Sequence, residues 1–310
     1  MYGERIHGLQ SVRQNSRNSR ITHTEHIKEG RAKDMANNYT IGTVEQKEYT
    51  VYINKYGYKS VDTDSVVTNR FNYSTKNNKL GENILNYGMD IMSTCAACEC
   101  KTKGICYGTC GFFQFGSNLN RAAENFMFWF TNGSSAMVDA IQHAIDSNPA
   151  CKKFRHFEIG DIPNEDYLKN VMIPSAEKNG DVKFWTYTKK YNIVNRFVEK
   201  YGLEAIPKNL TIVFSHWLNE DGTYFPMDNP YDFPTSEFIP VGKEEELLPH
   251  VTHVCPCSDP TVIAHCATCD HPCHDLKHGE SMALLEHSTK ASAKRDKELK
   301  AAHKALEASL

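Results

Sequence analysis

The stretch from Val182 to Ser215, VKFWTYTKKYNIVNRFVEKYGLEAIPKNLTIVFS, decides the fold of this chain. Val182–Thr188 and Leu210–Ser215 are rich in aromatic and β-branched residues, which favours strands. Between them, Tyr191–Tyr201 carries apolar residues three and four positions apart, which predicts a helix with one apolar side. A strand, a helix and a strand joined by short turns predict a right-handed crossover between parallel strands.

The same alternation extends toward the amino terminus. Asn120–Phe130 and Ser135–Ser147 have the apolar spacing of helices, and Phe154–Ile162 (FRHFEIGDI) has the alternation of a strand. Asn164–Glu177 is expected to form a further helix that Pro174 ends or kinks. We therefore predict an α/β fold with a parallel sheet, either open or part of a (β/α) barrel.

The flanking regions differ in composition. Residues 1–40 are polar and predict a flexible arm, whereas Tyr39–Tyr87 has the short β-branched runs of a small strand-rich segment. Leu218–Pro249 contains five prolines and predicts an irregular connection. Residues 285–310 are expected to form a charged helix, which leaves residues 41–284 as a single α/β domain with cysteine-rich metal-binding segments.

Composition narrows the classes of function. With 310 residues, 40% of them hydrophobic, and a formal net charge of -3, the chain can bury a core but has no general basic field for nucleic acid. No apolar run reaches the roughly 20 residues of a membrane span, and the polar start lacks a secretory signal. We therefore expect a cytoplasmic protein without a membrane partner. The basic tail at residues 290–304 fits either a solvated helix or a nucleic-acid contact.

Ten of the eleven cysteines form two clusters, and this density points to a metal. The first cysteine cluster holds Cys95, Cys98, Cys100, Cys106 and Cys110, and the second cysteine cluster holds Cys255, Cys257, Cys266, Cys269 and Cys273. Thiolates at these spacings bind zinc or iron–sulfur clusters. Disulfide frameworks belong to small secreted domains and are not expected here. We expect Cys95, Cys98, Cys106, Cys110 and all five cysteines of the second cysteine cluster to be ligands.

The spacing leaves the metal open. The second cysteine cluster can supply the four ligands of a closed zinc site, with His253, His265, His271 and His274 as further nitrogen donors, or it can hold an iron–sulfur cluster. The first cysteine cluster precedes the first clear helix, in a loop where a metal would meet a substrate. Cys151 stands apart and is expected to be a buried apolar residue. No His-Glu-x-x-His motif favours a zinc hydrolase.

Polar residues follow each predicted strand, and ligands bind at the carboxyl ends of parallel strands. We predict Asp161, Glu158 and Lys189 as catalytic residues, and Gly160, Asp161 and Ser215 as residues that bind a cofactor. Two other interpretations stay open: Asp161 caps the following helix, and Lys189 is an ordinary exposed lysine.

The order of these elements resembles that of the radical S-adenosylmethionine enzymes. In that superfamily a Cys-x3-Cys-x2-Cys loop holds a [4Fe-4S] cluster, and a glycine-rich acidic turn after the second strand binds the amino group of S-adenosylmethionine. Cys106 and Cys110 match the first two cysteines and Gly160-Asp161 matches the turn, but Phe113 stands where the third cysteine belongs. The resemblance implies an iron–sulfur enzyme with S-adenosylmethionine as cofactor and a third ligand from Cys95, Cys98 or Cys100.

Several motifs together resemble the phage and mobile-element proteins of the gene product 88-like family. They are NNKLGENILNYGMDIMSTC (77–95), RHFEIGDI (155–162), KFWTYTKKYN (183–192), IVFSHW (212–217) and CPCSDPTVIAHCATCDHPC (255–273). The resemblance spans Asn77 to Lys290 and implies two cysteine-rich sites around an α/β core, in a protein of the host cytosol if it is phage-encoded. Two functions follow: an iron–sulfur enzyme with one catalytic and one auxiliary site, or a zinc-stabilised module that binds nucleic acid or protein without catalysis.

Overall fold

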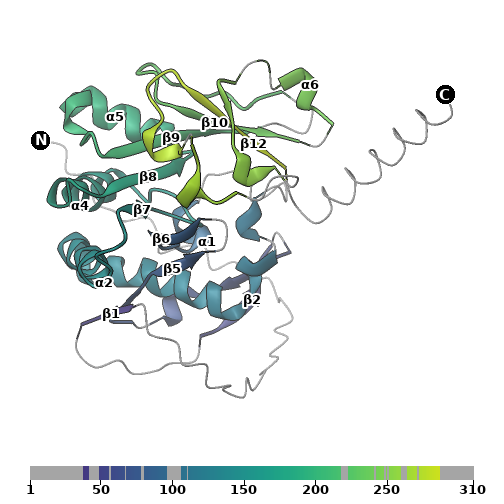
Figure 1. Cartoon of the computed structure of the whole chain (residues 1–310). Helices are drawn as coiled ribbons and strands as arrows, with labels where there is room; N and C mark the ends of the chain where they lie inside the picture. The colour runs from purple at the N-terminus through teal and green to yellow at the C-terminus, as the bar shows by residue number, and fades with distance from the viewer. Residues whose placement is uncertain are drawn as a thin grey trace, which may run out of the picture. The chain divides into compact units, whose positions relative to one another are not determined.

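The computed structural model (Figure 1) describes thirteen stretches of the chain. They are residues 38–41, 49–55, 57–66, 68–77, 80–95, 106–109, 111–217, 223–240, 242–247, 249, 251–259, 264–270 and 272–286. The predicted arm at residues 1–40 and the predicted helix at residues 285–310 fall almost wholly outside these stretches. Cys98, Cys100 and Cys110 also lie outside them. In the described part of the chain, no helix has the length and apolar character needed to cross a membrane.

An eight-stranded sheet forms the centre of the fold. Its strands are β5 (Ser74–Asn77), β6 (Gly81–Asn86), β7 (Lys153–Arg155), β8 (Lys183–Thr188), β9 (Leu210–His216), β10 (Thr235–Ile239), β11 (His253–Val254) and β12 (Ser281–Leu285). They are hydrogen-bonded in the order β11-β12-β10-β9-β8-β7-β6-β5, and only the pair β5-β6 is antiparallel. The predicted parallel sheet is therefore confirmed. Because β5 and β11 stand at its two ends, the described sheet is open, and the barrel alternative is not confirmed.

Two antiparallel pairs precede the main sheet. Strand β1 (Asn38–Thr40) pairs with β4 (Arg70–Asn72), and β2 (Val51–Ile53) pairs with β3 (Lys59–Val61). These pairs confirm the strand-rich segment predicted from the short β-branched runs.

The helices largely follow the apolar periodicity. They are α1 (Ile91–Thr94), α2 (Gly116–Asp146), α3 (Glu165–Tyr167), α4 (Ile173–Lys178), α5 (Tyr191–Tyr201) and α6 (Glu244–Leu247), with a π-helical turn at Leu168–Met172. Short 3-10 turns lie at Thr63–Ser65, Tyr107–Thr109, Gly111–Gln114, Leu203–Ala205, Pro256–Ser258, Cys266–Thr268 and Cys273–Asp275. The two helices predicted within α2 meet at Gly133, whose φ of 81° breaks the helical geometry. Residues 165–178 are helical without a break, so Pro174 does not end the predicted helix; the π-helical turn at Leu168–Met172 directly precedes it.

The helices cover one face of the sheet. From β6 to β10 each strand lies beside its predecessor in the same direction, so right-handed crossovers place every connecting helix on the same side. Figure 1 shows α2, α4 and α5 along that side. Phe154, Phe184 and Phe214 point from β7, β8 and β9 into the core beneath these helices. This arrangement leaves the opposite face of the sheet without helices from these crossovers.

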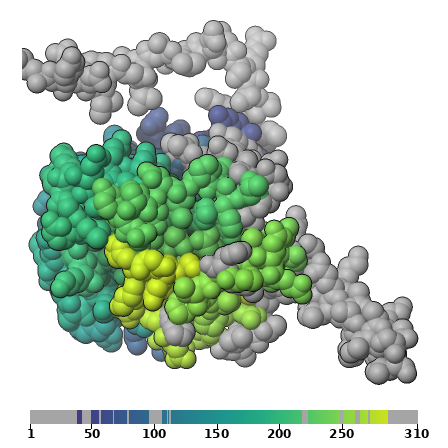
Figure 2. Space-filling model, turned by 90° about the horizontal axis from the view of Figure 1, so that it is seen from above, coloured from purple at the N-terminus to yellow at the C-terminus, as the bar shows by residue number. Residues whose placement is uncertain are grey.

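The second cysteine cluster covers that opposite face. Since side chains alternate along a strand, Trp185 of β8 and Val213 of β9 point away from the helices. They pack against Cys255, Cys273 and Leu276. Figure 2 shows the segment around residues 250–285, coloured light green to yellow, gathered on one part of the surface. The protein thus has three layers: helices, sheet and a cysteine-rich segment whose helical structure in the described residues is limited to 3-10 turns.

Two sequence predictions about element boundaries were wrong. The strand predicted over Phe154–Ile162 ends at Arg155, because Phe157 and Gly160 have positive φ angles of 56° and 88° that turn the chain off the sheet. The connection predicted as irregular contains β10, which pairs with both β9 and β12, and α6. The prolines at its ends concealed this five-residue strand, which is too short to show periodicity.

Candidate functional site

The carboxyl ends of β6, β7 and β8 bring several predicted residues together. Gly160 lies so close to the segment after β6 that a Cβ atom there would stand 2.7 Å from the Met89 carbonyl oxygen. The amide of Asp161 donates to Thr94 Oγ1 at 3.2 Å, and Thr94 Oγ1 lies 3.8 Å from Cys95 Sγ. Gly160 and Asp161 therefore lie against the segment after β6 that ends in Thr94 and Cys95.

Asp161 ties two strand ends together. Its Oδ1 accepts hydrogen bonds from Thr188 Oγ1 at 2.6 Å and from the Ile162 amide at 2.7 Å, and its Oδ2 accepts from the Lys189 amide at 2.9 Å. Burial raises the pKa of this carboxyl group, although the same hydrogen bonds act to lower it. These three hydrogen bonds give Asp161 a structural role, because they join the end of β7 to the end of β8.

The alternative that Asp161 caps the following helix is also wrong, because Asn164 is the cap. Asn164 Oδ1 accepts from the Tyr167 amide at 2.9 Å at the start of α3. The cap therefore lies three residues later than predicted, beyond Pro163.

Glu158 and Lys189, the other predicted catalytic residues, are half-buried at the same edge. Glu158 Oε2 accepts from Asn77 Nδ2 at 3.2 Å, and its carbonyl oxygen accepts from the Tyr107 hydroxyl. The Lys189 ammonium lies 4.2 Å from the centre of the Trp217 ring, a cation–π contact. Lys189 is therefore anchored and is not the ordinary exposed lysine of the other interpretation.

The described cysteines of the first cysteine cluster lie at this edge as well. Cys95 is buried and packs with Ile91 and Ile159. Gly108, two residues after Cys106, lies against the same two isoleucines and near Cys106 Sγ. The other three cysteines of this cluster fall outside the described residues, so only Cys95 and Cys106 can be located.

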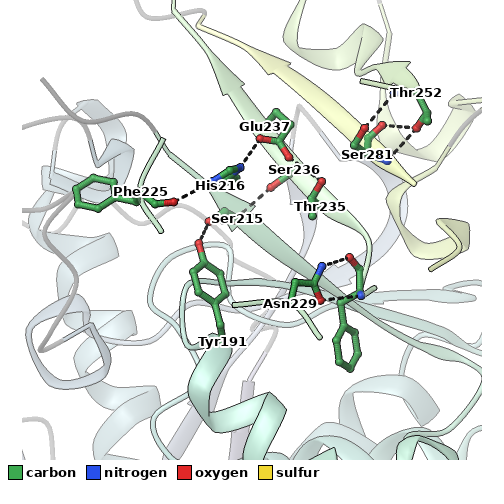
Figure 3. A network of polar contacts seen from close by, with 11 residues as sticks. Tyr191, Ser215, His216, Phe225, Asn229, Thr235, Ser236, Glu237, Thr252 and Ser281 are labelled. Atoms are coloured by element: carbon green, nitrogen blue, oxygen red, sulfur yellow. Dashed lines mark hydrogen bonds and ion pairs between the residues drawn. The ribbon is translucent and has the colours of Figure 1, made fainter. Parts of the chain in front are cut away.

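Ser215, predicted to bind a cofactor, takes part in a separate polar network at the ends of β9 and β10 (Figure 3). Its hydroxyl accepts from Ser236 at 3.3 Å and its carbonyl oxygen accepts from the Tyr191 hydroxyl. Ser215 directly follows Phe214, the register partner of Thr188, and Thr188 donates to Asp161 Oδ1. Ser215 and Asp161 therefore lie at the same edge of the sheet, with Thr188 between them.

The neighbouring His216 is half-buried at the end of β9. Its Nδ1 lies 2.8 Å from Glu237 Oε2 and its Nε2 lies 2.9 Å from the Phe225 carbonyl oxygen (Figure 3). Glu237 lies on β10, which the sequence did not reveal.

Thiols of the second cysteine cluster converge on the sheet face opposite the helices. Cys257 Sγ and Cys266 Sγ are 3.9 Å apart, and the Cys255 thiol is hydrogen-bonded to Cys257. Cys273 is buried beside them, and its Sγ accepts from the Tyr187 hydroxyl at 2.7 Å. Burial raises the pKa of the Cys273 thiol to about 12. Cys269 is half-buried in the same segment.

A cation stands beside these thiols. The Arg155 guanidinium carbon lies 5.1 Å from the centre of the Tyr187 ring, and its buried Nε has no acceptor among the described residues. Lys153, two residues earlier on β7, donates to the Ala267 carbonyl oxygen at 3.2 Å. Strand alternation places Arg155 and Tyr187 on the face opposite Phe154 and Phe184, and this pattern could have identified both residues from sequence.

The thiols are close together, but they do not have the geometry of a complete metal site. Within the stretches that the structure describes, no group of three or more His, Cys, Asp or Glu side chains is positioned to hold a metal ion. Two of the predicted nitrogen donors are His271 and His274. The His274 ring packs 5.3 Å from Trp185, with its Nε2 3.6 Å from Asp275, and His271 lies outside the described residues.

Comparison with known proteins identifies a family. A family model described as gene product 88 matches residues 63–278, which is more than half of the chain. The match supports the phage and mobile-element association implied by the sequence motifs. No curated protein and no solved structure matches the chain.

Proposed function

Because the chain belongs to the gene product 88 family, we propose that it is a metal-binding member of that family in which Cys255, Cys257, Cys266 and Cys273 hold one zinc ion. The ion has a structural role: it fixes the cysteine-rich segment onto the open face of the sheet. The observation that carries this proposal is the convergence of four thiols from three separate turns on one place.

The separation of the sulfurs favours a single ion. In a tetrahedral zinc site with zinc–sulfur bonds of about 2.3 Å, neighbouring sulfurs are about 3.8 Å apart. The 3.9 Å between Cys257 Sγ and Cys266 Sγ is close to that value. In a [4Fe-4S] cluster each cysteine binds a different iron atom, so its cysteine sulfurs stand farther apart. Cys255 and Cys273, which pack in the same cluster, would supply the other two ligands.

The surroundings of the thiols fit a charged metal centre. Four thiolates around a divalent ion leave a net negative charge, which an apolar sheet face would disfavour. The Arg155 guanidinium, with a buried Nε that lacks an acceptor, supplies a compensating charge. The hydroxyl of Tyr187 donates to Cys273 Sγ, as groups around metal ligands commonly do.

The cysteine-rich segment has little regular secondary structure, so a bound ion would stabilise it. The segment that covers Trp185 and Val213 is built of 3-10 turns, which have few backbone hydrogen bonds of their own. Such a segment loses much conformational entropy when it becomes ordered, and ligand bonds to one ion offset that loss.

Metal analysis of the purified full-length chain tests the proposal. We expect about one tightly bound zinc ion per chain, lost in Cys257→Ser and Cys266→Ser and retained in Cys151→Ala. Cys151 is a matched control because it is a buried cysteine in the helical core, away from the second cysteine cluster. Full zinc occupancy in both serine variants would refute the assignment, as would iron and sulfide in the place of zinc.

A second candidate function rests on the carboxyl edge of the sheet. Cys95 packs with Ile91 and Ile159 there, and Gly108, which lies against the same isoleucines, is close to Cys106 Sγ. This position favours an iron–sulfur centre of the first cysteine cluster that is open to a substrate. Anaerobically purified protein would then be brown and contain iron and sulfide, and Cys95→Ser or Cys106→Ser would remove both. Colourless protein without iron rules out this candidate.

A nucleic-acid partner stays a prediction. The basic tail at residues 290–304 lies outside the described residues. Removal of residues 287–310 followed by an oligonucleotide-binding measurement would test it.

A further inference from the structure

A cationic pocket at the carboxyl edge of the sheet has no part in the proposed metal site. It has a volume of about 340 Å³ and lies where the loop after β7 meets the loop after β8. Its lining consists of Pro163, Asn164, Glu165, Lys189, Lys190, Asn192, Ile193 and Arg196. Open α/β sheets bind ligands at this edge.

The charge of the pocket selects an anion. Three cationic side chains, Lys189, Lys190 and Arg196, line it together with a single acid, Glu165. That acid has a cationic neighbour outside the pocket, since Glu165 Oε1 lies 3.9 Å from Lys200 Nζ. Among the described residues, Lys190 and Arg196 have no acidic partner. Lys189 also interacts electrostatically with Asp161, whereas the charges of Lys190 and Arg196 raise the local concentration of anions.

The size and lining of the pocket select a small ligand. A volume of about 340 Å³ is at the lower end of the range for small-molecule sites. Asn164 and Asn192 add polar side chains, and Ile193 adds an apolar surface. The first turn of α5 borders the same pocket, and its amide groups contribute a smaller favourable potential for an anion.

We propose that this pocket binds a small phosphate ester, whose phosphate group is neutralised by Lys189, Lys190 and Arg196. The planar guanidinium of Arg196 can pair with two phosphate oxygens, and the lysines act as point charges beside it. The remainder of the ester lies toward Asn192 and Ile193. This ligand is independent of the metal, because no cysteine lines the pocket.

Calorimetric titration of the full-length protein at low ionic strength tests the proposal. The probes are two matched pairs, glycerol 3-phosphate with glycerol and AMP with adenosine, so that each pair differs only in the phosphate. We expect both phosphate esters to bind and both neutral partners not to bind. Lys190→Gln and Arg196→Gln should each weaken binding about tenfold, because each removes one charge-assisted interaction with the phosphate.

Two controls make the result decisive. Lys208→Gln removes the same charge from an exposed site outside the pocket and should leave the affinity unchanged. Cys266→Ser should also retain phosphate binding, so a failure of the metal proposal is distinguishable from a failure of this one. The proposal is refuted if neither ester binds at millimolar concentration, if the pocket variants bind as well as the wild type, or if a short oligonucleotide binds where both esters do not.

Discussion

Acidification should destabilise the protein through His156, which lies in the middle of the core. His156 is fully buried, its Nδ1 lies 2.8 Å from the Tyr87 hydroxyl, and its ring stacks on Phe184 at 5.7 Å. Its Nε2 has no partner among the described residues. Burial lowers the pKa of this imidazole from 6.5 to about 3, because no acidic group nearby compensates the charged form.

The direction and size of the effect follow from linkage. Between pH 6.5 and pH 3 the unfolded chain binds a proton at this histidine and the folded chain does not. The free energy of unfolding therefore falls as the pH falls through this window. With these two pKa values, the loss that His156 causes on going from pH 8 to pH 5 is about 2 kcal/mol.

Urea unfolding of the wild type and of His156→Phe at pH 8 and pH 5 measures this contribution. Phenylalanine cannot titrate, and Tyr87 keeps its hydrogen bond to the Tyr167 hydroxyl at 2.8 Å. The pH-dependent loss should therefore be smaller in the variant by about 2 kcal/mol. Other titrating groups, including any metal ligands, affect both proteins and cancel in the comparison. As a control, His143→Gln at an exposed position should lose as much free energy of unfolding between pH 8 and pH 5 as the wild type. Equal losses in the wild type and in His156→Phe would refute the reasoning.

Three further changes test other parts of the structure. Gly160→Ala should lower the free energy of unfolding in urea by roughly 2 kcal/mol or more, because it adds a steric clash to a positive φ. Gly279→Ala, at a positive φ but in open space, should lower it by about 1 kcal/mol. Equal losses in the two variants would contradict the close contact at Gly160. Glu237→Ala should destabilise the fold by about 1 to 3 kcal/mol, since it removes the acceptor of His216 Nδ1, and an unchanged unfolding midpoint would exclude this pair. Tyr187→Phe should weaken zinc binding about tenfold, measured by competition with a chelator, because it removes the hydrogen bond to Cys273 Sγ. An unchanged zinc affinity would show that this hydrogen bond does not support the site.

The local elements were predictable where the apolar pattern was strong. The predicted helix Tyr191–Tyr201 agrees with α5 residue for residue, and the two predicted strands beside it agree with β8 and β9 within one residue. These segments bury one side or both sides over six or more residues, so their periodicity is visible. Strand β10 is short and lies between prolines, and its pairing with β9 and β12 depends on residues distant in the sequence. No local pattern reveals such a pairing.

The candidate site, like the fold, was only partly predictable from the sequence. The sequence indicated which residues carry chemistry, because clustered cysteines and polar residues after strands are local patterns. It left open whether Asp161 caps a helix or faces a ligand, and only the tertiary structure showed its oxygens bonded to Thr188, Lys189 and Ile162. Hydrogen bonds of that kind join separate loops, so their partners cannot be derived from spacing.

The sequence by itself determined the alternation of strands and helices, the parallel sheet and the concentration of thiols in two segments, since each of these depends on neighbouring residues. The tertiary structure decided that every crossover helix lies on one face of an open sheet. It also decided that the second cysteine cluster closes the other face, beside Arg155 and Tyr187. The physical reason is that the exposed apolar face of a sheet must be buried, and the segment that buries it is selected by the packing of the whole chain.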